Sequence, residues 1–197
     1  MKCPSCHAPL AEPAPQCPGC GLTLDQLDQK FGLVPLYSRY FTDRTGKLSA
    51  REIEQLRDLL RLFERKFPQI LFSVLVVNLG PRFSISEYAF WLMNRARFGM
   101  LEAVGPKNFE LLLVVDPEGR TAALASGYGL EHYLPEQELE NSLAAGMPGF
   151  RNGDLARGIH DCVNFMMLRL REIALRLEKV NIAAEPSTVS TAVVETQ

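Results

Sequence analysis

Four of the five cysteines lie within the first 20 residues, in two Cys-x2-Cys pairs. Cys3 pairs with Cys6 in "CPSC", and Cys17 pairs with Cys20 in "CPGC". A gap of two residues lets both thiolates of a pair turn toward one metal ion, and two such pairs complete a tetrahedral set of sulfur ligands. We therefore predict that these four cysteines bind a structural zinc ion.

The residues between the cysteines favour a metal-bound ribbon over disulfides. Residues 1–23 carry too few large apolar side chains to form a core, so metal binding must drive their folding. Two disulfides are the alternative, but no apolar leader that would export the chain precedes the cysteines. We expect Gly19 and Gly21 to ease the backbone turns and His7 to face solvent. A closed site of four cysteines has no open position for a substrate.

Charge and hydropathy exclude several classes of partner. The formal net charge is −2, and residues 1–23 carry only Lys2 and Glu12 as charges and no aromatic side chain. We therefore expect no nucleic-acid binding, because both an electrostatic footprint and a stacking platform are missing. The longest apolar run, residues 70–79, is half of the roughly 20 residues that span a bilayer. We expect a cytoplasmic protein without a transmembrane segment, and a protein as its partner.

Apolar periodicity and turn signals divide the rest of the chain into elements. We expect a connector over residues 24–35, a main domain over 36–180 and a disordered tail over 181–197. Ser49 and Glu52 form a capping box for a helix that ends before Pro68, and a second capping box begins a helix at residue 84 that ends near residue 99. Further predicted elements are strands at 70–79, 109–116 and 121–126, a helix from about 135 to 145, and a long helix from 155.

The last two of these strands are joined across "PEGR" and predict a hairpin. The stretch 146–154, "GMPGFRNGD", is expected to break the helix before it. A helix, a strand, a helix, a hairpin and two helices, in this order, predict an α/β fold with a mixed β-sheet flanked by α-helices.

Four stretches in order resemble the TPM domain family, whose domains occur in thylakoid-lumen, photosystem II repair and bacterial envelope proteins. They are "YFTDRTGKLSAREIEQL", "LLLVVDPEGRTAAL", "SGYGLE" and "PGFRNGDLARGIHDCV", and the resemblance covers roughly residues 36–170. It implies a central sheet flanked by helices, with the Gly-Tyr-Gly-Leu-Glu turn near a cleft. Some members are described as calcium-binding acid phosphatases and others serve in assembly or repair of membrane complexes, so the family alone does not fix an activity.

The resemblance also marks a candidate cleft for a second metal or a ligand. Calcium or magnesium requires several converging oxygens, and the matching positions are Asp43, Asp116, Gly127, Tyr128, Gly129 and Glu131, with Asp154 as a further acidic residue. Local roles are the alternative, because Asp43 and Asp116 lie in turns and Asp154 precedes a helix. The glycines suit positive φ or a close backbone approach at a turn. Lys107 departs from the family pattern and would compete with a cation.

Other chemistry has weaker support. His132 and His160 have no Cys or Ser partner at suggestive spacing, and Cys162 falls on the apolar stripe of the last helix, where an inert thiol is expected. Arg57, Arg61 and Arg65 indicate a solvated helix face, with an acidic partner as the alternative.

The stretch 90–98, with the only tryptophan, fits a core helix or a partner surface.

For the whole chain, we expect a non-catalytic interaction or assembly module. The alternative is a calcium- or magnesium-dependent phosphatase that uses the carboxylate cleft.

Overall fold

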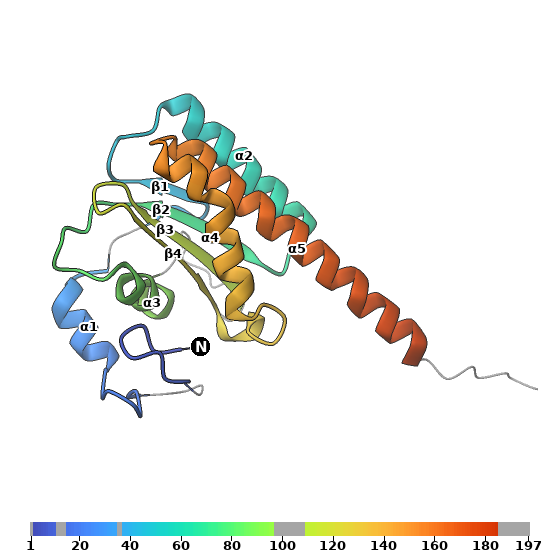
Figure 1. Ribbon diagram of the computed structural model, residues 1–197, viewed down its shortest axis with the longest axis horizontal. Helices are drawn as coiled ribbons and strands as arrows, with labels where there is room; N and C mark the ends of the chain where they lie inside the picture. Colours follow the sequence, from blue (N-terminus) through green and yellow to red (C-terminus); the bar gives the residue numbers. More distant parts are fainter. Residues whose placement is uncertain (1, 11–14, 35–36, 97–108, 185–197) are drawn as a thin grey trace, which may run out of the picture.

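The computed structural model describes residues 2–10, 15–34, 37–96 and 109–184, and side chains as far as residue 177. A four-stranded sheet lies between two helical layers (Figure 1). Its elements are α1 (Leu24–Phe31), β1 (Phe41–Asp43), α2 (Ala50–Lys66), β2 (Leu71–Val76), α3 (Ile85–Arg95), β3 (Glu110–Asp116), β4 (Thr121–Ser126), the short 3-10 helix η2 (Tyr128–Leu130), α4 (Glu136–Arg151) and α5 (Leu155–Ala184).

The sheet is mixed, as the sequence predicts. Its strand order is β1-β2-β3-β4, in which the first three strands are parallel and β4 is antiparallel to β3. The carboxyl end of the sheet, where β1, β2 and β3 stop, is therefore the end where β4 begins. The strand β1 was not predicted, because three residues are too few to show an alternating pattern.

Both faces of the sheet are buried, which explains the continuous apolar run in β3. Leu111, Leu113 and Val115 contribute to a core with α2, α4 and α5, whereas Leu112 and Val114 contribute to a second core with α1 and α3. Successive side chains of a strand point to opposite faces, so both sets must be apolar when helices cover both sides.

The helix α2 begins and ends as predicted. The Ser49 side chain accepts from the backbone N–H of Glu52, and the Glu52 side chain accepts from the backbone N–H of Ser49. Phe67 caps the other end, directly before Pro68. The second predicted capping box forms only in part: Ser84 accepts from the backbone N–H of Glu87, while the Glu87 carboxylate pairs with Lys30 of α1.

The predicted connector is largely the helix α1. Thr23 and Gln26 form a capping box that the sequence already contained, since threonine and glutamine stand three residues apart. Leu27 is buried against the α3 side of the sheet. The Asp28 carboxylate accepts from the Trp91 indole at 2.7 Å and from the Arg95 guanidinium at 2.8 Å. Trp91 is fully buried, so its side chain belongs to the core.

The break predicted over 146–154 begins later than expected, because α4 continues to Arg151 and only residues 152–154 separate it from α5. A Cβ on Gly146 would lie 2.4 Å from the Cys162 sulfur, and a Cβ on Gly149 would lie 2.4 Å from the backbone nitrogen of Gly158. These glycines let α4 and α5 cross in close contact. Tertiary packing thus outweighs the low helix propensity of glycine and also that of Pro148, which lies inside α4.

The last helix is longer than predicted. It runs to Ala184, so residues 181–184 of the predicted tail are helical, while residues 185–197 lie outside the described ranges. Figure 1 shows its second half extending past the sheet and α4. None of the helices in the described ranges combines the length and the apolar character that a bilayer span requires.

Candidate functional site

The four cysteines of the predicted zinc ribbon meet at one point. Their sulfur atoms all lie within 4.8 Å of one another, with Cys3 and Cys20 at 3.6 Å and Cys6 and Cys17 at 3.5 Å. All four are free thiols, so the disulfide alternative does not hold here. Tetrahedral ligation at a Zn–S distance near 2.3 Å requires sulfur atoms roughly 3.8 Å apart. The cluster therefore fits a four-sulfur metal site.

The two cysteine pairs fold as repeats of one turn. The backbone N–H of Cys3 donates to the carbonyl of Ala8, and the carbonyl of Cys3 accepts from the N–H of His7. The backbone of Cys17 makes the same two bonds, with the carbonyl of Leu22 and the N–H of Gly21. The fifth residue of each turn has a left-handed backbone, with φ of 76° at Gly21 and 60° at His7. Glycine takes this conformation freely, whereas histidine is strained by it. His7 is exposed, as the sequence predicts.

The thiols influence each other's ionisation. The backbone N–H of Cys20 lowers the pKa of Cys17 to about 6. The backbone N–H of Ala8 lowers the pKa of Cys6, but desolvation and the neighbouring thiols outweigh this effect and raise it to about 12. Burial likewise raises the pKa of Cys3. Four thiolates at this spacing repel one another, so a bound cation is needed to keep all of them ionised.

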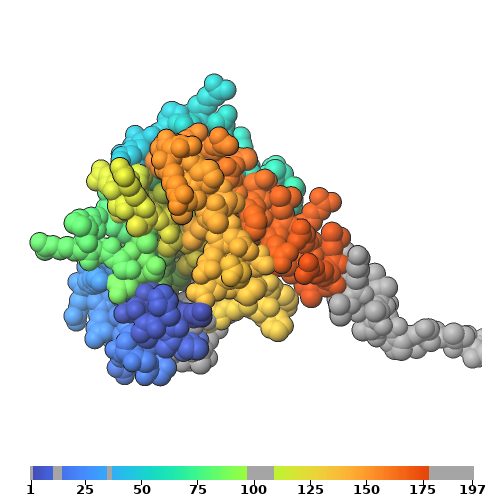
Figure 2. Space-filling model, viewed as in Figure 1, coloured from blue at the N-terminus to red at the C-terminus, as the bar shows by residue number. Residues whose placement is uncertain are grey.

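The ribbon, residues 2–10 and 15–23, packs against the main domain. Leu10 and Leu22 form a small apolar cluster with Phe90 of α3. Lys2 forms an ion pair with Glu136 at the start of α4, so the ribbon contacts both α3 and α4. Figure 2 shows the ribbon, in dark blue, and α4, in gold, as neighbouring lobes on one face of the molecule.

A groove of about 600 Å³ lies between the ribbon, α3, β4 and α4. Five consecutive residues of β4, Ala122–Ser126, line it, together with Phe90 of α3, Leu139 and Leu143 of α4, and His7 of the ribbon. Alternate residues of a strand point to opposite faces, so a groove lined by all five must follow the edge of β4 and not one face of the sheet. Glu131 of the predicted cleft also lines this groove.

The strand β4 is an edge strand whose outer backbone groups point toward the groove. The N–H of Gly127 donates to the carbonyl of Glu110, which makes Leu111 and Ser126 a non-hydrogen-bonded pair of the antiparallel ladder. By alternation, the N–H and C=O groups of Ala122, Leu124 and Ser126 face away from β3. Among the described residues, no other backbone segment hydrogen-bonds to these groups.

The structure does not bring the residues of the predicted cleft together. Asp43 and Asp116 end β1 and β3 at the carboxyl end of the sheet, whereas Gly127 to Glu131 follow β4 at the other end. Seven residues of β3 separate the two ends, which is a distance of about 20 Å. No single cation can contact both groups.

Asp43 organises a local turn. One carboxylate oxygen accepts from the backbone and the hydroxyl of Thr45, both at 2.7 Å, and from the N–H of Gly46 at 3.1 Å. The other oxygen accepts from the N–H of Leu48 at 3.2 Å. These donors face the oxygen lone pairs that a cation would need.

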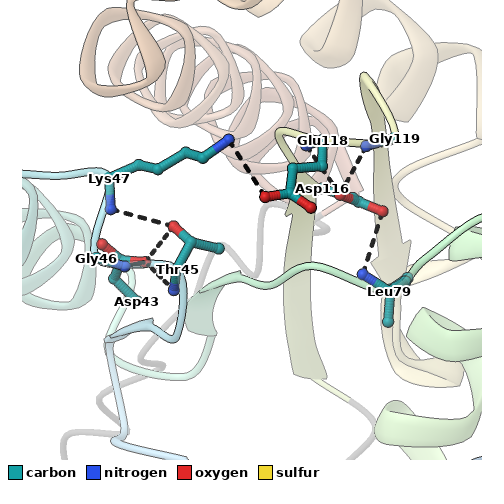
Figure 3. Close-up of polar contacts among 8 residues, drawn as sticks. All are labelled: Asp43, Thr45, Gly46, Lys47, Leu79, Asp116, Glu118 and Gly119. Carbon is teal, nitrogen blue, oxygen red and sulfur yellow. Dashed lines mark hydrogen bonds and ion pairs between the residues drawn. The ribbon is translucent and has the colours of Figure 1, made fainter.

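Asp116 is buried and has the same role in the β3–β4 turn. It accepts from the N–H groups of Glu118 and Gly119 through one oxygen, and from the N–H of Leu79 through the other. Figure 3 shows the Asp43 and Asp116 turns on either side of a gap, with Lys47 reaching across to Glu118 at 3.9 Å. The recorded partner of the Lys47 ammonium group is the exposed Glu118 carboxylate and neither aspartate.

The Gly-Tyr-Gly-Leu-Glu turn does not use positive φ. Gly127 has φ of −70°, and Tyr128 and Gly129 lie within the short helix η2. Gly127 donates to Glu110, so the turn closes the end of the sheet. Of the two reasons expected for these glycines, positive φ was wrong, and the left-handed positions lie elsewhere, at Gly21 among others.

The remaining predicted residues have local roles. Asp154 accepts from the backbone N–H of Arg157 and begins α5 as a cap. Cys162 is fully buried, and burial raises the pKa of its thiol to about 12. Arg61 pairs with Glu54 and Asp58 on the same helix, as a solvated face requires. Lys107 lies outside the described residues.

These features define a class of protein: a small α/β domain with a mixed four-stranded sheet and a four-cysteine ribbon at its amino-terminal side. The family model of the TPM domain matches residues 41–167, which is more than half of the chain. The chain therefore belongs to the TPM domain family. No protein with a curated description matches the sequence.

Solved structures share this fold. The N-terminal domain of a P. gingivalis protein is 25% identical with a TM-score of 0.51, and the match covers 70% of this chain and 93% of that chain. The N-terminal domain of the cg2496 protein of Corynebacterium glutamicum is 12% identical with a TM-score of 0.53, over 84% and 95% of the two chains. The BA42 protein of the psychrophilic bacterium Bizionia argentinensis is 16% identical with a TM-score of 0.55, over 66% and 86%.

Proposed function

We propose that this chain is a cytoplasmic protein-interaction module, in which a zinc-loaded ribbon and the edge of β4 frame a groove for an extended segment of a partner protein. The observation that carries this proposal is the groove beside the outward backbone groups of Ala122, Leu124 and Ser126. An extended peptide adds to such an edge through main-chain hydrogen bonds, and pockets beside the strand select its side chains.

The sequence of β4 lacks the residue types that usually protect a free edge. Its sequence, TAALAS, contains no lysine, proline or charged residue. Proteins block exposed edges with such residues because unpaired N–H and C=O groups recruit other strands. The walls of the groove include the apolar side chains of Phe90, Leu139 and Leu143, which favour alternate apolar residues in the bound segment, and α4 adds the carboxylates of Glu136 and Glu140.

Zinc contributes structure to this site. Residues 2–10 and 15–23 have a core of only Cys3, Leu10 and Cys17, so the metal would hold the ribbon in shape as one wall of the groove. A reducing compartment keeps the four thiols available for it. Elemental mass spectrometry of the purified chain should find one zinc per chain, and a chain with no bound metal at neutral pH would contradict this role.

Selection from a random peptide library displayed on phage tests the groove directly. The zinc-loaded chain should enrich peptides with alternating apolar residues, and Ala122→Pro should lose them, because proline removes one outward N–H at an edge position that tolerates it. Ala122→Ser keeps that N–H and is the matched control. Equal enrichment by Ala122→Pro and Ala122→Ser would refute the proposal.

A second candidate is a divalent-cation-dependent phosphatase of the kind described for some TPM domains. Asp43 and Asp116 lie at the same end of the sheet, which favours it. However, both carboxylates already accept backbone N–H groups through both of their oxygens. Calorimetric titration with calcium, for wild type and Asp43→Ala, separates the candidates: a second ion that is lost in the variant supports the phosphatase, and no heat in wild type excludes calcium from the pair.

A further inference from the structure

A second cavity, of about 640 Å³, lies at the carboxyl end of the sheet, away from the ribbon. The β3–β4 turn and the α4–α5 connection form its sides, and its lining includes three cations, Lys47, Arg120 and Arg151. Its apolar lining includes Leu143, Met147, Phe150 and Leu155. Cations beside an apolar cavity are the arrangement that suits a ligand with one charged end and one apolar end.

Arg120 has a backbone conformation that its side chain disfavours. Its φ is 52°, in the left-handed region that glycine prefers. Gly119, directly before it, is required where it stands, because a Cβ there would lie 2.6 Å from an oxygen of Asp116. The hairpin thus carries an arginine at a position where a second glycine would be less strained, which points to a role for the guanidinium itself.

The charges of the cavity are mainly uncompensated. Among the residues that the structure describes, neither Arg120 nor Arg151 has a carboxylate oxygen within 4.0 Å. Lys47 has Glu118 at 3.9 Å, a long ion pair between exposed side chains. The one acidic residue that lines the cavity is Asp116, whose oxygens accept three backbone N–H groups. The guanidinium groups are therefore available to an external anion.

We propose that this cavity binds a small amphipathic anion, with a carboxylate or phosphate head on Arg120 and Arg151 and an apolar body against Met147, Phe150 and Leu155. A guanidinium group binds either a carboxylate or a phosphate through paired N–H donors. A body of about eight carbon atoms is well within the volume of the cavity. This site shares Ala122 and Leu143 with the lining of the groove along β4, but neither residue is assigned to the anion, so each proposal can fail without the other.

Titration of the 15N-labelled chain with octanoate, octyl phosphate, octanol and inorganic phosphate tests the proposal by NMR. Octanoate or octyl phosphate should shift the amide signals of Thr121, Met147 and Gly153, with a Kd at least ten-fold below that of octanol. The anion with the lower Kd, octanoate or octyl phosphate, shows whether the site prefers a carboxylate or a phosphate head. Equal binding of octanol, shifts elsewhere, or equally tight binding of inorganic phosphate would overturn the proposal.

The variant Arg120→Gly separates binding from folding. Glycine fits the left-handed position, so the melting temperature should rise while the Kd for the tighter anion increases at least five-fold. Arg65→Gln, on the exposed face of α2, is the control for a loss of one positive charge and should leave the Kd unchanged. An unchanged Kd in Arg120→Gly, whatever its melting temperature, would overturn the assignment of Arg120.

Discussion

The crossing of α4 and α5 predicts that Gly149→Ala destabilises the domain. A Cβ at this position would lie 2.4 Å from the backbone nitrogen and 2.7 Å from the Cα of Gly158, and 3.0 Å from the carbonyl oxygen of Asp154. All three atoms belong to the backbone, so no side chain can rotate away. Overpacking costs up to about 3 kcal/mol, and the helix propensity of alanine returns about 1 kcal/mol. The net loss is about 2 kcal/mol.

Thermal and urea unfolding followed by circular dichroism measure this loss. A domain of this size should lose about 4–8 °C in melting temperature for about 2 kcal/mol. Gly153→Ala is the control from the same connection, because no atom lies within 4 Å of its Cβ and only its left-handed φ of 76° opposes alanine. It should lose about 1 kcal/mol. A rise in melting temperature for Gly149→Ala, as helix propensity alone predicts, would refute the close crossing.

Three further predictions follow from single residues. His7→Gly removes a left-handed histidine and should stabilise the ribbon by up to about 1 kcal/mol, seen as slower zinc loss to a chelator; faster loss would contradict the strain at His7. The hydrogen bond from Trp91, together with Arg95, lowers the pKa of Asp28 below its usual value. The stability that the ionised Asp28 carboxylate contributes is therefore complete above about pH 4 and is lost as the pH falls through the lowered pKa. The gap in melting temperature between wild type and Asp28→Asn should shrink below pH 4, and a constant gap would refute this role of Asp28. The Cys162 thiol, buried and with a raised pKa, should not react with Ellman's reagent in the folded, zinc-loaded chain, and rapid labelling would contradict its burial.

Local signals in the sequence predicted much of the fold. The α2 capping box, the strands of the hairpin and the apolar stripe of α5 each depend on residues close together in the chain. The cysteine spacing likewise predicted the cluster, because two knuckles at one metal leave few other arrangements. What the sequence could not show was pairing across long separations, such as β1 with β2, or the close approach of Gly149 to Gly158.

The candidate cleft shows the same limit. Motif order placed Asp43, Asp116 and Glu131 in one cleft, but the antiparallel hairpin returns the chain to the opposite end of the sheet before Glu131. The ribbon and the turn at Glu131, considered separately in the sequence, instead line one groove. Arg120 offered no signal in the sequence, because its strained φ depends on the geometry of the turn.

Hydrogen exchange with a selected peptide bound is the most direct test of the groove. Strand addition predicts that the amides of Ala122, Leu124 and Ser126 exchange at least ten-fold more slowly in the complex, because each faces the open edge. The amides of Ala123 and Ala125 already pair with β3 and should change little. Protection confined to other parts of the chain, or no protection along β4, would contradict strand addition as the mode of binding.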